Sequence, residues 1–505
     1  MTNPLYDQLF GKHAGKQTPF LLFQDGTVLT HAAFLEQAAR FAHVLTEGGL
    51  KPGDRVAVQV HKSAEALALY AACVQAGIVF LPLNTAYTVD ELDYFIDNSG
   101  ARIVICDDGS KTLLQPVADR LGAGVETLNA DGSGSLSDRS AAMPAHYPTV
   151  ERSADDLAAF LYTSGTTGRS KGAMLTQDNL LSNAATLADL WRFTANDVLL
   201  HALPIFHTHG LFVATNVTLI AGGSMIFLPK FDQDAVIDLL PKATAMMGVP
   251  TFYTRLLGDE RFNRELTGHM RLFVSGSAPL LAETHKDFED RTGHRILERY
   301  GMTETNMNTS NPYDGERKAG TVGPPLPGVE LIITDPDTAQ ELPQGDIGQI
   351  EVRGPNVFKG YWQMPEKTAA ELRDNGFFIT GDLGRIDEDG YVQIVGRNKD
   401  LIISGGYNIY PKEIELLLDE QPGVLESAVI GVPHADFGET VLGVIVPRPG
   451  ETPDPEQILQ VAGASLARFK HPRKLVIVDS LPRNTMGKVQ KNLLRDAFKD
   501  TFAAG

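Results

Sequence analysis

The sequence predicts an α/β protein with at least two domains. Three observations lead to this class. Short apolar, β-branched runs alternate with helical patterns up to about Val322, strand-like runs lie closer together after it, and a compact α+β pattern follows residues 396–400. The chain has 505 residues, 43% of them hydrophobic, so it can bury more than one core.

The earlier part of the chain has the alternation typical of parallel sheets covered by helices. Strands are expected at RIVICDD, LAAFLYTS, SMIFLP and RLFVSGS, and helices at AEALALYAACVQAG and DNLLSNAATLADLWRF, where apolar residues recur at spacings of three and four. Strand and helix patterns that alternate in this way indicate βαβ units.

The later part of the chain is expected to be antiparallel. VELIITD, GQIEVRG and YVQIVG read as strands, and Asp389-Gly390 is a turn signal, so a hairpin or small barrel is predicted. After GRNKD, a helix should begin at Pro411 and run through KEIELLLDE, among the strands ESAVIGVP, LGVIVPR and KLVIVDS. We place the domain boundary at GRNKD.

Charge and composition exclude several classes of function. A net charge of −19 disfavours a nucleic-acid or anionic-membrane partner over a broad face. Cys73 and Cys106 are too few and too far apart for a disulfide scaffold, which fits a reducing cytoplasm. The N-terminus lacks a signal-peptide pattern, and no run approaches the roughly 18 apolar residues that span a bilayer. A cytoplasmic, soluble protein is therefore expected.

The segment YTSGTTGRSKG, residues 162–172, predicts a phosphate-binding loop between a strand and a helix. Its glycines let backbone amides approach an anion, its hydroxyl groups add donors, and Lys171 adds a positive charge. It is not a Walker loop, because Lys171 follows a serine instead of a glycine.

Five motifs in order give the chain a resemblance to the acyl-adenylate-forming superfamily, which includes acyl-CoA synthetases. They are the loop, YGMTE (300–304), ITGDLG (379–384), GRNKDLIISGGYNIYPKEIE (396–415) and LPRNTMGKVQK (481–491). The resemblance implies an N-terminal domain, residues 1–396, with two α/β subdomains and a small distorted β-barrel. It also implies a mobile α+β C-terminal domain, residues 397–505.

The resemblance implies a role for each motif in joining a carboxylate to the α-phosphate of ATP. Lys488 would bridge the two reacting anions, and Glu304 would help to hold Mg²⁺. Tyr300 would stack on adenine, and Asp382, with Arg397 beside it, would accept the ribose hydroxyls. The implied catalytic residues are Thr303, Glu304, Lys488 and His207. The implied ATP-binding residues are Thr163, Ser164, Gly165, Thr166, Thr167, Gly168, Lys171, Tyr300, Gly301, Thr303, Asp382 and Arg397. The implied metal ligands are Glu304 and Thr166.

A second half-reaction with coenzyme A is implied as well. The C-terminal domain would pivot at Lys399 so that Gly405, Gly406 and Tyr407 face the site. Glycines there would let the backbone line a narrow tunnel for pantetheine. Lys470 and Arg473, with Lys474, lie in a basic segment and are candidates for the CoA phosphates.

Short sequence segments suggest which carboxylic acid the protein activates. LPIFHTHG, GVPTFYTRLL and SGSAPLL resemble bacterial malonyl-CoA synthetases, some of which accept methylmalonate. His207 would sit at the mouth of the acyl pocket. Phe252, Arg255 and Leu256 share one helix face by spacing, and Arg255 alone could be a plain exposed arginine. The resemblance implies that this helix lines the acyl pocket, where a buried Arg255 would bind a second carboxylate. Ser277, Met302 and Met307 are further pocket candidates; zinc at His201, His207 and His209 is disfavoured, since no acidic or cysteine ligand is near.

Other functions stay open at this point. The runner-up is a short-chain or aryl acyl-CoA synthetase, or an adenylation domain that loads a carrier protein, although no carrier domain follows residue 505. From another class, the alternative is a nucleotide-binding sensor or chaperone that keeps the fold without turnover. Intact Lys171, Glu304 and Lys488 argue against it, because a pure binder needs no lysine at the reacting carboxylate.

Overall fold

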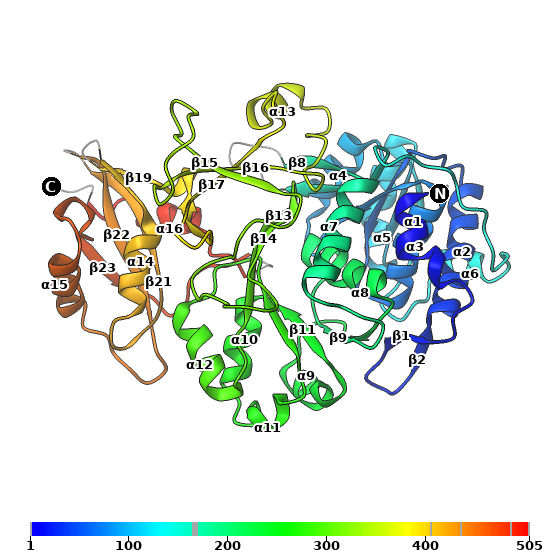
Figure 1. The fold of residues 1–505 in the computed structure, drawn as a ribbon. Coiled ribbons are helices and arrows are strands. Elements are labelled where there is room, and N and C mark those ends of the chain that lie inside the picture. Colours follow the sequence, from blue (N-terminus) through cyan, green and yellow to red (C-terminus); the bar gives the residue numbers. More distant parts are fainter. Residues whose placement is uncertain (1–2, 164–169, 405–406, 435–436, 485–486, 503–505) are drawn as a thin grey trace.

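A computed structural model describes residues 3–163, 170–404, 407–434, 437–484 and 487–502. Figure 1 shows the N-terminal α/β part at one side, a second α/β part beside and below it, and the C-terminal lobe at the opposite side. Strands β15 to β17 and helix α13 lie above the junction. The chain is therefore a mixed α/β protein with a large multi-sheet N-terminal part and a separate C-terminal domain.

The first sheet has the strand order β6-β5-β3-β4-β7-β8 and is parallel except for β8. Its strands are β3 (Arg55–Gln59), β4 (Val79–Pro82), β5 (Ile103–Cys106), β6 (Gly124–Thr127), β7 (Leu157–Thr163) and β8 (Lys171–Thr176). The helices of this part are α1 (Pro4–Leu9), α2 (His31–Glu47), α3 (Ala64–Ala76), α4 (Val89–Ser99), α5 (Asp108–Leu121) and α6 (Ser135–Ser140).

Both faces of this sheet are covered. Val56 and Val58 pack in the core that contains α2 and α3, whereas Ala57 between them packs in the core that contains α4 and α5. This alternation follows from the two-residue period of a strand. Burial on both faces explains why the strands are continuous apolar runs in the sequence.

The second sheet has the order β14-β13-β12-β11-β9-β10-β1-β2, with antiparallel strands at its two ends. The strands are β1 (Pro19–Leu22), β2 (Val28–Thr30), β9 (Val198–His201), β10 (Ser224–Phe227), β11 (Ala245–Gly248), β12 (Leu272–Ser275), β13 (Leu297–Met302) and β14 (Asn306–Ser310). Its helices are α7 (Gln177–Leu190), α8 (Asn216–Ala221), α9 (Gln233–Leu239), α10 (Pro250–Leu257), α11 (Arg264–Thr267) and α12 (Ala282–Thr292). One core joins α7 and α8 to both sheets, so the two α/β parts pack as one body.

The expected antiparallel region is the sheet β15-β16-β17-β18, with α13 (Pro365–Glu371) beside it. The strands are β15 (Glu330–Thr334), β16 (Gly348–Arg353), β17 (Phe378–Ile386) and β18 (Val392–Arg397). The predicted turn at Gly390 joins β17 to β18, and its φ of 84° is one that glycine adopts without strain. This sheet carries Asp382 and Arg397 toward the centre of the molecule.

The C-terminal domain has an α+β fold, as predicted. Its sheet, β20-β19-β22-β21 with β23 on β22, comprises β19 (Ile402–Ser404), β20 (Tyr407–Ile409), β21 (Val424–His434), β22 (Gly438–Pro447) and β23 (Lys474–Ile477). Helices α14 (Pro411–Asp419), α15 (Pro455–Ser465) and α16 (Lys491–Phe498) pack on it. Helix α14 begins at Pro411, which confirms the predicted helix start.

Candidate active site

The predicted phosphate loop joins two antiparallel strands. Thr163 ends β7 and Lys171 begins β8, and these two residues pair across the ladder. The prediction that a helix directly follows the loop was wrong, because β8 comes first and α7 begins only at Gln177. Ser164, Gly165, Thr166, Thr167 and Gly168 lie outside the described residues.

Lys171 and Glu304 lie on either side of one tyrosine. The Lys171 ammonium is 3.1 Å from the Tyr361 hydroxyl and 3.3 Å from Glu371 Oε2. Oε1 of the buried Glu304 lies 3.1 Å from the Tyr361 hydroxyl oxygen and 3.4 Å from Thr163 Oγ1. The structure therefore brings a cation and a carboxylate of the predicted phosphate site together.

The predicted nucleoside residues form a second cluster. The Tyr300 hydroxyl donates to Asp382 Oδ2 at 2.5 Å, and Arg397 Nε lies 2.6 Å from Asp382 Oδ1. Asp382 and Arg397 are register partners of β17 and β18. The Asp382 charge is the main cause that raises the pKa of Arg397, and burial is the main cause that raises the pKa of Tyr300. Each Asp382 oxygen keeps a lone pair that a further hydroxyl can use.

Gly301 is required by backbone packing. The β13–β14 register shifts between Tyr300 and Gly301, and a Cβ at Gly301 would come within 1.8 Å of the Asn306 carbonyl oxygen. The half-buried Met302 ends β13, and Thr303 follows it in the turn to β14. A glycine at this bulge therefore fixes the direction of the segment that ends in Glu304.

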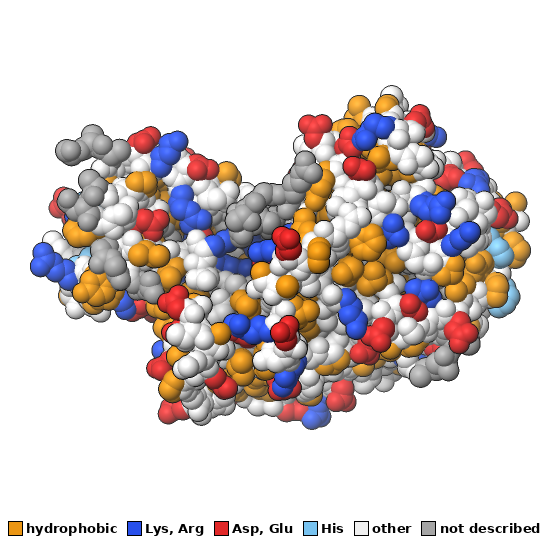
Figure 2. All heavy atoms as spheres, turned by 90° about the horizontal axis from the view of Figure 1, so that it is seen from above, with side chains coloured by type: hydrophobic (Ala, Val, Ile, Leu, Met, Phe, Trp, Pro, Cys, Tyr) orange, Lys and Arg blue, Asp and Glu red, His pale blue; other side chains and the backbone are white. Residues whose placement is uncertain are grey.

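Lys488 is presented to this site by a tight loop of the C-terminal domain. Lys488 N donates to Asn484 Oδ1 at 3.0 Å, and Gly487 packs near Thr251 at the start of α10. Surrounding protein atoms lower the pKa of Lys488; Arg397 and Arg299 add to this effect, whereas Asp382 and Glu304 oppose it. Lys488 is nevertheless exposed to solvent. Figure 2 shows that Lys and Arg side chains gather in the hollow between the two lobes.

His207 and His209 bring a second wall of the site close to Lys488. His207 Nδ1 accepts a hydrogen bond from His209 N at 3.3 Å, and His209 Nδ1 lies 3.1 Å from the Ser277 hydroxyl. Burial, with the nearby charges of Lys488 and Arg299, lowers the pKa of His207 to about 3. His207 is therefore a neutral imidazole at physiological pH, with Nε2 as its hydrogen donor.

Arg299 is the residue that sequence reasoning missed. It lies on β13, only 4% exposed, and its Nε and Nη2 have no hydrogen-bond partner within the described part of the chain. Its guanidinium would come within about 2.3 Å of a Cβ at position 276, so Gly276 makes room for it. Burial lowers the pKa of Arg299 to about 9, and its charge acts on His207, His209 and Lys488. A buried, unpaired cation of this kind calls for an anionic ligand.

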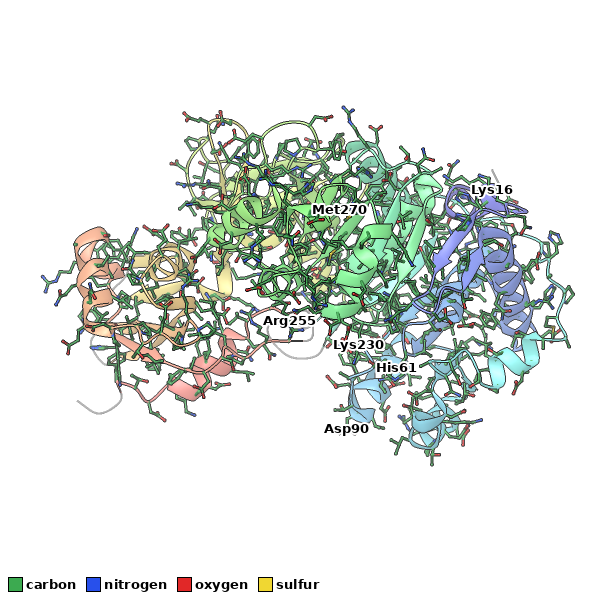
Figure 3. All side chains as sticks on the ribbon, turned by 90° about the horizontal axis from the view of Figure 1, so that it is seen from below. Lys16, His61, Asp90, Lys230, Arg255 and Met270 are labelled. Atoms are coloured by element: carbon green, nitrogen blue, oxygen red, sulfur yellow. The ribbon has the colours of Figure 1, made fainter. Side chains whose placement is uncertain are left out.

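The predicted burial of Arg255 was wrong. Leu256 is buried in α10, but Arg255 is exposed, with its guanidinium 6.0 Å from the Phe231 ring. Figure 3 shows Arg255 on the side of the central part that faces the C-terminal domain. The residue lies one turn after Thr251, on the boundary of the apolar face, and a small rotation of that face turns it outward.

The residues predicted for CoA lie on the C-terminal domain. Tyr407 is 57% exposed and stacks on Phe469, with ring centres 4.7 Å apart. Lys470 forms an ion pair with Glu413, and Arg473 lies over the Phe437 ring. Gly405 and Gly406 lie outside the described residues.

The predicted hinge residue Lys399 lies in a short 3₁₀ turn, Asn398–Asp400, between β18 and β19. Arg495 of α16 pairs with Asp400 at 2.9 Å. This turn connects the N-terminal part to the C-terminal sheet, and the contact from α16 ties its end to the C-terminal domain.

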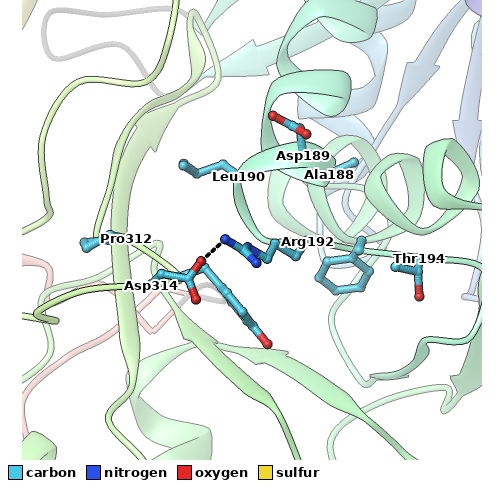
Figure 4. Close-up of a pocket in the computed structure, with 9 residues that line it drawn as sticks. Ala188, Asp189, Leu190, Arg192, Thr194, Pro312 and Asp314 are labelled. Carbon is cyan, nitrogen blue, oxygen red and sulfur yellow. Dashed lines mark ion pairs between the residues drawn. The ribbon is translucent and has the colours of Figure 1, made fainter.

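In the ranges that the structure covers, no three His, Cys, Asp or Glu side chains form a group suited to a metal ion. A surface hollow of about 570 Å³ lies at the end of α7, next to the Arg192–Asp314 ion pair, and contains none of the predicted site residues (Figure 4). No helix among the described residues is long and apolar enough to cross a membrane.

Comparison with protein families identifies the class. Residues 11–362 match the AMP-binding enzyme family, and residues 413–488 match the AMP-binding enzyme C-terminal domain. The chain therefore belongs to the AMP-binding enzyme family and is an AMP-forming ligase.

Individual relatives are similar over nearly the whole chain. ATP-bound MatB from Rhodopseudomonas palustris is 61% identical, with a TM-score of 0.97 over 99% of this chain and 100% of that one; its apo form, with the same identity and coverage, has a TM-score of 0.88. A malonate–CoA ligase of Arabidopsis thaliana is 36% identical over 90% of this chain and 79% of its own. A feruloyl-CoA synthase of Amycolatopsis is 37% identical, covering 94% of each chain.

Proposed function

We propose that this protein makes malonyl-CoA from malonate, ATP and coenzyme A, through a malonyl-adenylate, with release of AMP and pyrophosphate. The relatives named MatB and malonate–CoA ligase support this acid. Methylmalonate is a further candidate, since it differs from malonate by one methyl group, which is worth only about 1–3 kcal/mol in a pocket.

The observation that carries the proposal is the buried guanidinium of Arg299, whose Nε and Nη2 have no hydrogen-bond partner among the described residues. A monocarboxylic acid would present its only carboxylate to ATP and leave Arg299 buried without a partner. A dicarboxylic acid of three carbons places its second carboxylate toward Arg299, with Ser277 and His209 beside it. Arginine suits this role because it can bind a carboxylate with two parallel hydrogen bonds.

The first half-reaction brings the other carboxylate to the α-phosphate. Tyr300, Asp382 and Arg397 would hold the nucleoside, and Lys171 would act on the phosphates that leave. Lys488 faces the same centre and would neutralise the charge that concentrates between carboxylate and phosphate in the transition state. His207 and Met302 would line the acyl side, and Thr303 would contact the α-phosphate.

A magnesium ion fits the donor set around Glu304. Within the described ranges its Oε1 has two polar neighbours, at 3.1 and 3.4 Å, and carboxylate oxygen is the ligand type that Mg²⁺ prefers. Mg²⁺ commonly takes one or two carboxylates and completes its shell with phosphate oxygens and water, so one buried glutamate is sufficient. When bound, the ion would neutralise the triphosphate.

The second half-reaction requires the C-terminal domain to turn about Lys399. Lys488 would leave the site, and the segment that contains Gly405, Gly406 and Tyr407 would face it. Lys470 and Arg473 would then contact the CoA phosphates. We place the boundary at residues 396–397, ahead of the first strand of the C-terminal sheet at Ile402.

AMP release with a panel of acids tests the proposal. The protein is mixed with ATP, magnesium and CoA, and with malonate, methylmalonate, succinate, acetate or ferulate. We expect the highest kcat/KM for malonate or methylmalonate, and a value at least about 10²-fold lower for acetate, which leaves Arg299 unpaired. A preference for acetate or ferulate would contradict the proposal.

A further inference from the structure

The Lys171 ammonium is contacted by both a carboxylate and a tyrosine. Its ammonium lies 3.4 and 3.3 Å from the two carboxylate oxygens of Glu371, 3.1 Å from the Tyr361 hydroxyl and 4.3 Å from the centre of the Tyr361 ring. The side chains of Lys171 and Glu371 are only 15% and 22% exposed. An ion pair with this little exposure is screened less than a surface pair.

The backbone fixes the three groups relative to one another. Trp362 N donates to the Gly172 carbonyl at 2.8 Å, and Tyr361 forms a bridge with Ala173, so this segment is attached to β8 directly after Lys171. Tyr361 N donates to Thr368 Oγ1 of α13 at 2.9 Å, and Glu371 is the last residue of that helix. The carboxylate thus stands at a defined place beside the strand that carries Lys171.

The Tyr361 hydroxyl connects this ion pair to Glu304. It lies 2.6 Å from Glu371 Oε2 and 3.1 Å from Glu304 Oε1. A phenol has one hydrogen to donate, and the shorter distance assigns that hydrogen to Glu371. Glu304 therefore keeps its lone pairs free of a strong donor.

The two carboxylates have separate tasks in this arrangement. Burial raises the pKa of Tyr361, so the phenol stays protonated, and hydrogen bonds from Lys367 and Tyr361 outweigh the burial of Glu371 and lower the pKa of its carboxyl. If the Glu371 charge were absent, the Tyr361 hydrogen and the Lys171 ammonium would both be free to turn toward Glu304, a remaining carboxylate of this network.

We propose that Glu371 is a positioning residue for ATP. It holds Lys171 in the orientation that receives the phosphates, and it takes the Tyr361 hydrogen so that Glu304 stays available. The inference rests on the proposed role of Lys171 at the phosphates of ATP, and it goes beyond that role by assigning a function to the end of α13.

ATP binding by the Glu371→Gln variant tests the proposal. Gln keeps the size of the side chain and removes its charge. Calorimetry with ATP and magnesium, without acid or CoA, should show a Kd at least roughly tenfold higher than that of the wild type, the scale of one hydrogen bond to a charged group. KM for ATP should rise to the same extent, with KM for malonate and CoA within about twofold, and Glu371→Asp should recover part of the affinity.

Lys367→Met is the matched control. Lys367 pairs with the same carboxylate at 2.6 Å from the more exposed side of α13, and its side chain is 39% exposed. This variant should bind ATP with a Kd within about twofold of the wild type. An equal loss in both variants would show that stability of α13, and not position of Lys171, is what matters.

Unchanged or tighter ATP binding by Glu371→Gln would overturn the proposal. Tighter binding is what the simple loss of a negative charge near phosphates would give. This result can be told apart from failure of the proposed function. A wild type that binds ATP but releases no AMP with malonate refutes malonate as the substrate. The ATP affinities of the variants still decide the role of Glu371.

Discussion

Two cations enter one cleft from different parts of the fold. Arg299 lies on a strand inside the N-terminal part and is fixed by burial, whereas Lys488 comes on a loop of the C-terminal domain. Each lowers the pKa of His207, so both positive charges act on the same space. Like charges in a poorly solvated cleft repel, and an anion between them relieves this repulsion. The pair therefore favours a ligand that is negative at both ends.

The Arg299→Met variant should lose malonate selectively. Met removes the charge and keeps much of the volume, so the second carboxylate of malonate loses its partner. We expect kcat/KM for malonate to fall by roughly 10²-fold or more and that for propionate to change far less. The comparison variant is Arg255→Leu, expected within about threefold of the wild type for both acids. A selective loss of malonate activity in Arg255→Leu instead would return the carboxylate site to α10.

Lys488→Ala should separate the two half-reactions. Loss of the ammonium removes charge stabilisation only where carboxylate and α-phosphate react, so exchange of pyrophosphate into ATP should fall at least about 10²- to 10³-fold. Thioester formation from supplied malonyl-adenylate and CoA should stay within a few fold. Equal loss in both assays would mean that the lysine supports the structure of the loop.

At the scale of elements, the periodicity of apolar residues predicted which segments form strands and helices. It did not predict whether a residue at the edge of an apolar face is buried or exposed. Helix α10 begins at Pro250 as predicted, yet residues 252, 255 and 256 span a wide arc, and Arg255 lies at its exposed edge. Arg299 had no signal of its own in β13, since burial of that strand depends on α/β layers distant in sequence. Glu371 is one acid among many until α13 brings it to Lys171.

A stacked histidine pair makes the N-terminal elements sensitive to acid. His13 of a short 3₁₀ turn (Gly11–His13) and His31 of α2 have ring centres 4.4 Å apart, and both are buried. Burial is the main cause that lowers the pKa of each ring to about 4; Lys16 adds to the effect on both, and Lys12 on His13. The folded state thus favours neutral rings, whereas the unfolded chain takes up protons at about pH 6.5.

The contribution of these two rings to the free energy of unfolding should therefore be constant above pH 6.5. It should fall as the pH drops from 6.5 toward 4. Each ring accounts for up to about 3 kcal/mol of this loss. His13→Gln, whose amide can still donate to the Leu219 carbonyl, should show a smaller difference in the free energy of unfolding between pH 7.5 and 5.0. Urea titrations at both values measure it, with the exposed His146→Gln as control. If the free energy of unfolding changes between pH 7.5 and 5.0 as much in the His13 variant as in the wild type, the prediction is contradicted.

At the scale of the whole molecule, the sequence predicted a second domain but not its orientation. The sequence can predict a boundary at GRNKD because a change of strand and helix pattern depends on local residues. Gly487 lies near Thr251, and the charges of Arg397 and Arg299 act on Lys488. This placement depends on how separately packed cores meet. In this structure these charges act on Lys488, and Tyr407 is exposed.

Restricting the turn at Lys399 should therefore stop the enzyme after its first half-reaction. Proline fixes φ near −65°, a value suited to the first turn of a helix, so Lys399→Pro is compatible with the 3₁₀ turn seen here but hinders a large rotation about it. Pyrophosphate exchange with malonate should stay within about threefold of the wild type, whereas thioester formation should fall at least roughly 10²-fold. Lys399→Ala, which removes the same side chain and leaves the backbone free, should retain both activities. Loss of thioester formation in the alanine variant as well would assign the effect to the lysine side chain, and loss of exchange in the proline variant would show that the turn is needed for the adenylation orientation itself.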